Sequence, residues 1–224
     1  MGDNTHDDAE IAAMRHEYAA GGLAEADLAA DPVAMFERWF DDVRRVNLHE
    51  PNAMVISTVG ADGSPSSRMV LLKGFADDGF RFFTNTASHK GADLAANPRC
   101  SLLFPWHLLE RQVRIDGVAQ PLPREDVEAY AHARPRGSQL GAWASHQSQP
   151  AEGRAALDDA YAAVEARFDG VPDDELPVPE EWGGYLVVPT AVEFWQGRKG
   201  RLHDRLVYHR PDADAPWSTR RLQP

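Results

Sequence analysis

Between residues 53 and 122 the chain carries a series of strand-forming runs joined by short turn signals, and this pattern limits the fold more than any other feature. The runs AMVISTV, SSRMVLLKGF and FRFFTN are rich in β-branched and aromatic residues and are separated by ADGS and DDG, which are typical of hairpin turns. CSLLFPW and RQVRIDGVAQPL follow, and GYLVVP, AVEFWQ and RLHDRLVYHR lie near the C-terminus. Six or more antiparallel strands with helices between them predict an α+β protein built on a β-barrel.

Helices are expected before and between these strands. Residues 11–20, followed by two glycines, predict a short helix. Asp31 as N-cap and Pro32 at the first helical position predict a helix that continues to residue 48. The remaining expected segments are a helix over 89–97 capped by Ser88, helices over 124–133 and 152–168, a polar loop over 134–150 and a Pro-rich linker over 171–182.

Composition excludes several classes of protein. The 35 acidic and 23 basic residues give a net charge of -12, which disfavours a general binder of nucleic acid or anionic membranes. No apolar run approaches the roughly 20 residues that span a bilayer, and the acidic start MGDNTHDDAE does not resemble a signal peptide, so a cytoplasmic protein is expected. Cys100 is expected to be a buried structural thiol, and the spacing of the histidines predicts no metal site.

Within this acidic chain, residues 193–210 carry five cationic side chains. If residues 201–210 form a strand, its period of two places Arg201, His203 and Arg205 on one face. Two guanidiniums beside an imidazole suit a phosphate or a carboxylate, although a solvated strand face is the alternative. Trp195 in the same stretch suits either a core or interface position or a platform for a ligand.

Two further groups contain cationic residues that suit an anion. Arg68 and Lys73 have opposite parity along one run, so either the strand bends or the two serve different parts of a site. A helix that starts near Ser88 offers free N–H groups, and His89 and Lys90 add charge there. An ordinary surface role stays open for each group.

A last group combines hydroxyl and guanidinium donors. Tyr130 and Arg134 are four residues apart at a helix end, so they share one face, and Ser138 follows in the expected loop. Together these donors suit a monophosphate. Taken alone, Tyr130 is as well explained by packing.

Several separated motifs occur in order between residue 14 and the C-terminus: RMVLLKGF, FTNTASHKG, SLLFPWHLLERQVRIDG, RPRGSQLGAWASHQS, EFWQGRKGRLHDR and RLQP. Together they resemble the family of pyridoxamine 5′-phosphate oxidase, also called pyridoxine/pyridoxamine 5′-phosphate oxidase. The resemblance implies an FMN-binding split β-barrel of antiparallel strands with peripheral helices. It also implies a homodimer with one FMN in each of two clefts between the subunits, a flexible N-terminal lid over residues 1–30, and a single FMN-binding domain over 31–224.

The resemblance also implies roles for individual residues. FMN would be held by Arg68, Met69, Val70, Leu71, Leu72, Lys73, Phe83, Thr84, His89, Lys90, Gln112, Gln147 and Ser148, with Trp195 and Arg205 from the partner side. The substrate would be bound by Arg15, Tyr18, Lys73, Tyr130, Arg134, Ser138, Arg201 and His203. Arg201 and His203 would be catalytic, His203 assisting proton removal, whereas Arg198 and Lys199 are expected to form a solvated turn.

The implied reaction oxidises C4′ of pyridoxamine 5′-phosphate or pyridoxine 5′-phosphate by hydride transfer to the flavin. Dioxygen then reoxidises the flavin to give hydrogen peroxide, and the product is pyridoxal 5′-phosphate. A split-barrel flavin or deazaflavin reductase with another substrate, and a non-catalytic carrier of FMN or pyridoxal phosphate, stay open as alternatives. Where the family commonly has Ser-Arg-Lys, this chain has Ser88-His89-Lys90, so FMN binding is expected to weaken more than in Arg-bearing relatives as pH rises through about 6 to 8.

Overall fold

In the computed structural model, which describes residues 11, 13–14, 17–19 and 21–224, the described chain forms a nine-stranded antiparallel sheet. The strand order is β2-β1-β5-β6-β7-β4-β3, and β8 and β9 continue the sheet beside β7. The strands are β1 (Ala53–Val59), β2 (Pro65–Leu71), β3 (Gly74–Ala76), β4 (Gly79–Asn85), β5 (Arg99–Trp106), β6 (Arg111–Pro121), β7 (Trp182–Gln196), β8 (Asp204–His209) and β9 (Ser218–Arg221). This α+β split barrel confirms the expected fold class.

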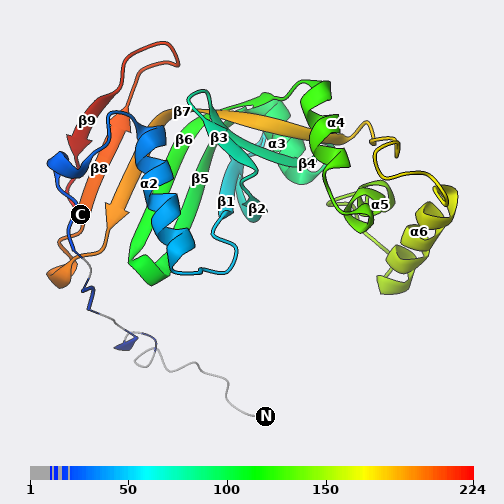
Figure 1. Cartoon of the computed structure of the whole chain (residues 1–224), viewed down its shortest axis with the longest axis horizontal. Helices are drawn as coiled ribbons and strands as arrows, with labels where there is room; N and C mark the ends of the chain where they lie inside the picture. Colours follow the sequence, from blue (N-terminus) through cyan, green and yellow to red (C-terminus); the bar gives the residue numbers. More distant parts are fainter. Residues whose placement is uncertain (1–10, 12, 15–16, 20) are drawn as a thin grey trace.

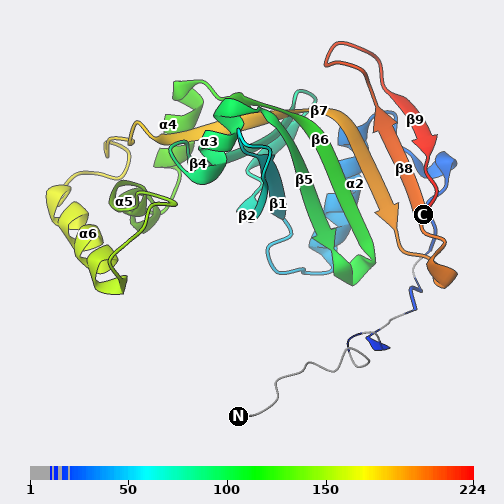
Figure 2. The same ribbon diagram turned by 180° about the vertical axis from the view of Figure 1, so that it is seen from behind.

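Helix α2 (Pro32–Arg45) covers one face of the curved sheet, as the two opposite views show (Figures 1 and 2). The carboxylate of Asp31 accepts hydrogen bonds from the backbone N–H groups of Val33 and Ala34, which caps the helix as expected. The apolar stripe of α2 is buried among side chains of the sheet, and Phe36 lies at its centre with no exposed surface. The main core is therefore the space between α2 and the sheet.

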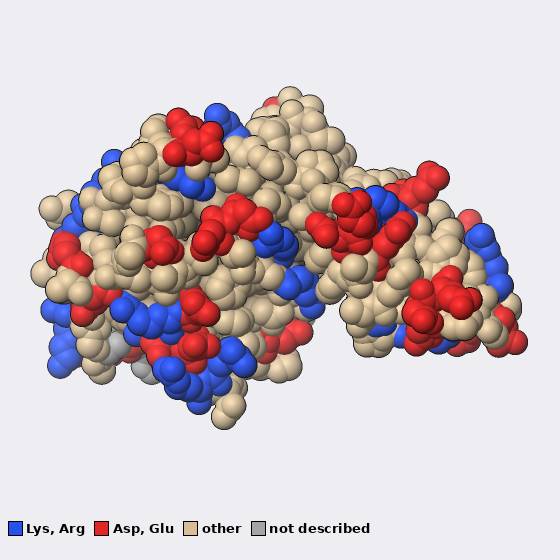
Figure 3. Space-filling view, turned by 45° about the horizontal axis from the view of Figure 1, so that its top comes forward, with Lys and Arg blue, Asp and Glu red and all other residues tan. Residues whose placement is uncertain are grey.

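The other helices gather at one end of the molecule. They are α3 (His89–Ala96), α4 (Arg124–His132), α5 (Arg136–Ala144) and α6 (Arg154–Arg167). Figure 1 places α5 and α6 at the far side from β8, β9 and the C-terminus, and Figure 3 shows a notch that sets this lobe off from the body. The lobe has a small core of its own, made of Leu140, Phe168 and Leu176.

Two expectations about loops and strands were wrong. The polar loop expected over 134–150 contains α5, because Leu140 is buried against Phe168 and Leu176, and this tertiary contact outweighs the low helix propensity of the two glycines in the segment. The two strands expected over 184–189 and 191–196 are one continuous strand, β7, with a bulge at Thr190, where consecutive residues Asp116 and Gly117 of β6 pair with Ala191 and Pro189.

The strand expected over 201–210 begins only at Asp204. Gly200 and Arg201 have φ values of 65° and 62°, in the left-handed region, so the chain turns there instead of extending. Arg201 and His203 consequently do not share a strand face with Arg205. The run over 66–75 also breaks, into β2 and β3, and Lys73 lies in the break.

Of the helix expected over 11–20, the described residues Ile11 and Ala13 are helical, whereas Met14 and Glu17–Ala19 have no regular structure. The backbone N–H of Ala19 donates to the Glu110 carboxylate at 3.0 and 3.2 Å, and that of Leu23 donates to Asp204 at 2.9 Å. These donors are paired with side chains of the body of the protein instead of with a helical turn.

Phe36 gives a test of this core. Its ring lies 5.0 Å from those of Phe75, Phe80 and Phe104, so Phe36→Ala leaves a large cavity and should lower the free energy of unfolding by about 3–5 kcal/mol. Urea denaturation measures this change. Leu157→Ala on α6, at a side chain that is 45% exposed, is the control and should change the value by less than about 0.5 kcal/mol. A small effect of Phe36→Ala would contradict the assignment of the core.

Candidate active site

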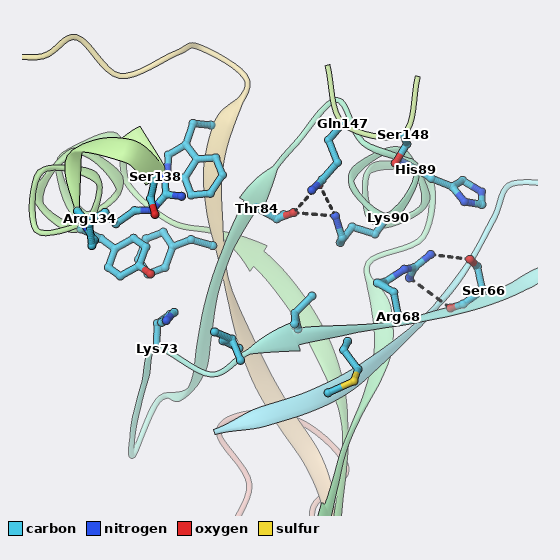
Figure 4. A pocket seen from close by; sticks show the side chains of 17 residues that line it. Ser66, Arg68, Lys73, Thr84, His89, Lys90, Arg134, Ser138, Gln147 and Ser148 are labelled. Atoms are coloured by element: carbon cyan, nitrogen blue, oxygen red, sulfur yellow. Dashed lines mark hydrogen bonds between the residues drawn. The ribbon is translucent and has the colours of Figure 1, made fainter. Parts of the chain in front are cut away.

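A cavity of about 650 Å³ lies between the β2–β4 region, α3 and the α4–α5 region (Figure 4). Most of the expected ligand-binding residues line it: Arg68, Met69, Val70, Leu71, Lys73, Phe83, Thr84, His89, Lys90, Tyr130, Arg134, Ser138, Gln147 and Ser148. Ser66, Pro135 and Trp182 line it too and were not anticipated. Figure 4 shows two polar groups on opposite sides of the cavity, one around Arg68, His89 and Lys90 and one around Arg134 and Ser138, with Lys73 toward the second.

The first polar group is organised around the buried ammonium of Lys90. Its Nζ donates to Thr84 Oγ1 at 2.7 Å, to Ser88 Oγ at 3.0 Å and to Gln147 Oε1 at 2.6 Å. Burial, and then the nearby charge of Arg68, lower the pKa of Lys90 to about 8. None of the three partners is charged, so an anion bound here would stabilise the protonated amine.

Arg68 points into the same side of the cavity from β2. Its Nη1 donates to Thr58 Oγ1 at 2.6 Å and to the Ser66 carbonyl at 3.2 Å, and its Nη2 donates to Ser66 Oγ at 2.5 Å. His89 stands beside it at the start of α3, and the His89 backbone N–H donates to Ser148 Oγ at 3.2 Å. A strand, a helix start and a loop thus bring hydrogen-bonding groups to one place, which suits a phosphate.

The second polar group is bounded by aromatic rings. Phe83 and Tyr130 stack with their centroids 3.9 Å apart, and the Arg134 guanidinium lies 4.1 Å from the centre of the Trp182 ring. Burial lowers the pKa of Arg134, and its Nη1 is buried with no hydrogen-bond partner among the described residues. A buried donor without a partner is costly, so this position fits a ligand that brings an acceptor.

The remaining expected residues form a separate group around Trp195, here called the β7–β8 group: Tyr18, Gln112, Trp195, Arg201, His203 and Arg205. The rings of Trp195 and His203 are 4.6 Å apart, Tyr18 packs edge-on against both, and Arg201 lies 5.7 Å from the Tyr18 ring. Gln112 is the strand partner of Trp195. Arg205 is held by two bonds to the buried Glu193 carboxylate, at 2.9 and 3.0 Å.

This β7–β8 group is far from the cavity within one chain. Trp182 at the start of β7 lines the cavity, whereas Trp195 lies near the end of the same strand. The strand has 15 residues, and at about 3.3 Å per residue its ends lie roughly 40 Å apart. Figure 1 agrees, with α4 and α5 at one end of the molecule and the start of β8 at the other. A single chain therefore does not join the two parts of the expected site.

Some expected residues lie elsewhere or play another part. Leu72 has its side chain buried in the main core, and Arg15 lies outside the described residues. Arg198 and Lys199 are exposed, as expected of a solvated turn. The Arg198 backbone N–H also donates to Nδ1 of His203 at 3.1 Å, and its side chain lies 3.6 Å from Asp204. Burial, and then the charge of Arg201, lower the pKa of His203.

Comparison with known proteins identifies the family. A family model described as pyridoxamine 5′-phosphate oxidase matches residues 40–168, which is more than half of the chain. The chain belongs to the pyridoxamine 5′-phosphate oxidase family. A second model, described as the C-terminal dimerisation region of pyridoxine 5′-phosphate oxidase, matches residues 182–224. The chain is accordingly an oxidoreductase of this family.

Relatives named pyridoxine/pyridoxamine 5′-phosphate oxidase match nearly the whole chain. One from a Nocardioides species is 66% identical over 96% of this chain and 98% of its own length. One from Cupriavidus pinatubonensis is 52% identical over 96% and 99%. Among solved structures, PhzG from Burkholderia lata, in complex with tetrahydrophenazine-1-carboxylic acid, is similar with a TM-score of 0.83 and 32% identity, over 92% of this chain and 99% of that one.

Among the described residues, no helix is both long and apolar enough to cross a membrane. The same residues contain no cluster of His, Cys, Asp and Glu that could hold a metal ion.

The pKa of Lys90 predicts how anion binding depends on pH. Lys90 carries its charge below about pH 8 and loses it above, so sulfate, whose own charge is constant, should bind more weakly at high pH. We expect the rise in Tm that sulfate causes, relative to chloride, to be roughly halved or less at pH 9.5 compared with pH 7. Lys90→Gln should show a small rise at both values, and the exposed Lys199→Gln should behave as wild type. An equal rise in wild type at both values would contradict the assignment.

Proposed function

We propose that the protein is an FMN-dependent oxidase that converts pyridoxamine 5′-phosphate and pyridoxine 5′-phosphate to pyridoxal 5′-phosphate. The observation that carries this proposal is the pair of donor groups on opposite sides of one cavity (Figure 4). Two such groups suit two phosphate esters bound side by side, a cofactor and a substrate. The cavity volume of about 650 Å³ falls within the range of cofactor and substrate sites.

The Lys90 side of the cavity fits the phosphate of FMN. Lys90 and Arg68 are two cations that donate hydrogen bonds to neutral hydroxyl, amide and carbonyl groups, and Arg68 also lies 3.7 Å from the Asp93 carboxylate. The start of α3 adds the positive end of a helix dipole. In this proposal Met69, Val70 and Leu71 of β2 line the flavin and ribityl part. The other proposed contacts at this side are Lys73, Phe83, Thr84, His89, Gln147, Ser148 and the backbone of Leu72, whereas Gln112 would contribute from the β7–β8 group of the partner copy.

The Arg134 side fits the phosphate of the substrate. Its buried Nη1 has no partner among the described residues, and Lys73, Tyr130 and Ser138 line the same cavity. PhzG provides the rival, because its solved complex holds a tricyclic carboxylic acid without phosphate. We favour a phosphorylated substrate because the match to relatives named for phosphate esters is closer, at 66% against 32% identity, and because the Arg134 group supplies the donors such a substrate needs.

The proposed reaction balances as follows. The amine, water and O2 give the aldehyde, ammonia and H2O2, whereas the alcohol and O2 give the aldehyde and H2O2. Bound FMN would supply the acceptor for the hydride from C4′ and pass both electrons to O2. The part of this chain is to hold C4′ against the cofactor, which makes positioning its main contribution.

Arg201 and His203 would orient the pyridine ring of the substrate. Nδ1 of His203 accepts the hydrogen bond from the Arg198 backbone, so the neutral ring carries its proton on Nε2. We therefore propose that His203 donates a hydrogen bond from Nε2, in place of the proton removal that the sequence suggested. Tyr18 would close this part of the site, since its ring packs against His203 and Trp195.

We further propose that the complete site needs two copies of the chain. The cavity and the β7–β8 group lie at opposite ends of β7, so neither copy supplies both parts. In a symmetric homodimer, Trp195, Arg201, His203 and Arg205 of one copy would face the cavity of the other. The match of residues 182–224 to a dimerisation region supports this arrangement.

The oxidase activity is tested by adding pyridoxamine 5′-phosphate to the FMN-loaded protein in air. We expect one H2O2 for each pyridoxal 5′-phosphate, measured by a peroxidase assay and by absorbance of the aldehyde. Pyridoxamine without phosphate is the matched control and should react far more slowly. Flavin binding with no peroxide would favour a carrier, and peroxide from only non-phosphorylated substrates would favour the PhzG-like rival.

Arg201→Ala and His203→Ala test the assigned roles. Each should lower kcat by about tenfold or more, because C4′ is no longer oriented, while bound FMN stays close to one per subunit. Flavin absorbance and steady-state rates separate the two effects. Lys199→Ala in the adjoining turn is the control and should match wild type. Variants that simply lose FMN would show that both residues belong to cofactor binding.

Mixed dimers test the sharing of sites between subunits. Arg134→Ala damages the cavity and His203→Ala damages the β7–β8 group, so each homodimer should be weakly active. When the two are unfolded together and refolded at equal concentration, random pairing gives mixed dimers with one undamaged site, and roughly a quarter of wild-type activity should return. Recovery no greater than the mean of the two variants would mean that each chain contains a complete site.

A further inference from the structure

Asp93 is a buried carboxylate directly behind the cationic side of the cavity. It lies on α3, and only 4% of the residue is exposed. We propose that Asp93 and Thr58 form a positioning relay that holds Arg68 in place for a ligand phosphate. This inference rests on the proposed function, because it assigns the phosphate of FMN to Arg68.

The relay consists of two short hydrogen bonds in series. The Thr58 hydroxyl donates to Asp93 Oδ2 at 2.6 Å, and Arg68 Nη1 donates to the same hydroxyl at 2.6 Å. The Arg68 guanidinium also lies 3.7 Å from Asp93 directly. Thr58 has no exposed surface, so water does not compete for either bond.

The direction of these bonds is fixed by chemistry. An ionised carboxylate can only accept, so the single proton of the Thr58 hydroxyl must point at Asp93. The lone pairs of the hydroxyl then face Arg68, which can only donate. The buried charge of Asp93 thereby orients the hydroxyl, and the hydroxyl orients the guanidinium.

Thr58 is a polar residue on the buried face of a strand, where an aliphatic side chain would be expected. Strand β1 buries every second residue, and Met54, Ile56 and Thr58 form its buried face. A valine would fill the third position equally well, whereas a hydroxyl there needs both of its bonds satisfied. The polar side chain is thus explained by the relay and not by packing.

The relay leaves the outer edge of Arg68 for a ligand. Nη1 uses both of its protons on Thr58 and the Ser66 carbonyl, and Nη2 uses one on Ser66 Oγ. Nε–H and the second Nη2–H have no hydrogen-bond partner in the described part of the chain, and these are the two donors of a bidentate contact with a phosphate. Rotation of the guanidinium would lose that contact.

Other charged groups nearby do not replace Asp93. His89 Nε2 lies 3.6 Å from Asp93 Oδ1, but the His89 side chain is 64% exposed, so this contact is weak. Asp62 in the β1–β2 turn is bonded to Ser64. Lys90 is held by Thr84, Ser88 and Gln147. The Thr58 hydroxyl bridges Arg68 to Asp93 alone.

Binding of FMN and of riboflavin separates this role from a purely structural one, because riboflavin lacks the phosphate. Thr58→Val keeps the shape of the side chain and removes the relay, and Asp93→Ala removes its anchor. Each should weaken FMN binding about tenfold, the effect of losing a hydrogen bond to a charged group, and leave the Kd of riboflavin within about twofold. Quenching of flavin fluorescence measures both constants.

Three companion variants sharpen the test. Thr58→Ser keeps the hydroxyl and should retain FMN affinity within about threefold. The double variant Thr58→Val/Asp93→Ala should bind FMN no more weakly than the weaker single variant, because both act through Arg68. Ser57→Ala removes a hydroxyl from the opposite face of the same strand and should match wild type.

The outcomes distinguish this inference from the function on which it rests. Wild-type protein that binds no FMN would overturn the proposed function. Wild-type FMN binding that is unchanged in Thr58→Val, or weakened equally for riboflavin, would overturn the relay alone. A Thr58→Ser variant as weak as Thr58→Val, or additive losses in the double variant, would also overturn it.

Discussion

The continuous pairing of β7 is the constraint on which the rest of the molecule depends. This strand pairs with β6 along almost its whole length, with β4 along its first half and with β8 along its second. It therefore fixes the cavity at one end and the β7–β8 group at the other, on one rigid element. A strand of this length cannot bring its own ends together, and this is the physical basis of the proposed site shared between two copies.

The second constraint is the burial of positive charge in an acidic protein. Lys90, Arg68 and Arg134 line one cavity, and burial lowers the pKa of Lys90 and of Arg134. The protein compensates with neutral oxygen atoms at Lys90, with a single buried carboxylate behind Arg68, and with an aromatic face at Arg134. Each solution holds the cation without neutralising it fully, so attraction for an anion is preserved.

Much of the fold followed from local sequence signals, because those signals act over a few residues. The ADGS and DDG turns, the Asp31-Pro32 helix start and the Ser88 cap each depend on neighbours in sequence, and each has the expected structure. The expected ligand residues on β2, β4, α3 and the α4–α5 region also line one cavity.

The features that sequence reasoning missed depend on distant contacts. Helix α5 forms because Leu140 packs against Phe168 and Leu176, and no local sequence pattern predicts that contact. The alternation of residues 201–210 predicted a strand over that whole range, but the left-handed backbone conformation of Arg201 delays its start. Thr58 and Asp93 are 35 residues apart, and a Thr in a strand or an Asp in a helix gives no sign of the other. The only available signal was a hydroxyl in place of an aliphatic side chain on a buried strand face.

The same electrostatics bears on the ligand class proposed for the Arg134 side of the cavity. A ligand without an acceptor at this position would leave the buried Nη1 of Arg134 unpaired, which costs about 1–3 kcal/mol and more for a charged group. Stacking on Trp182 holds the guanidinium at that position, so it cannot turn toward solvent to recover the loss. A site built around an obligatory partner rejects ligands that lack it more strongly than an apolar pocket rejects a change of size. The unpaired atom therefore does more to discriminate between a ligand with an anionic acceptor and a neutral ligand than the volume of the cavity does.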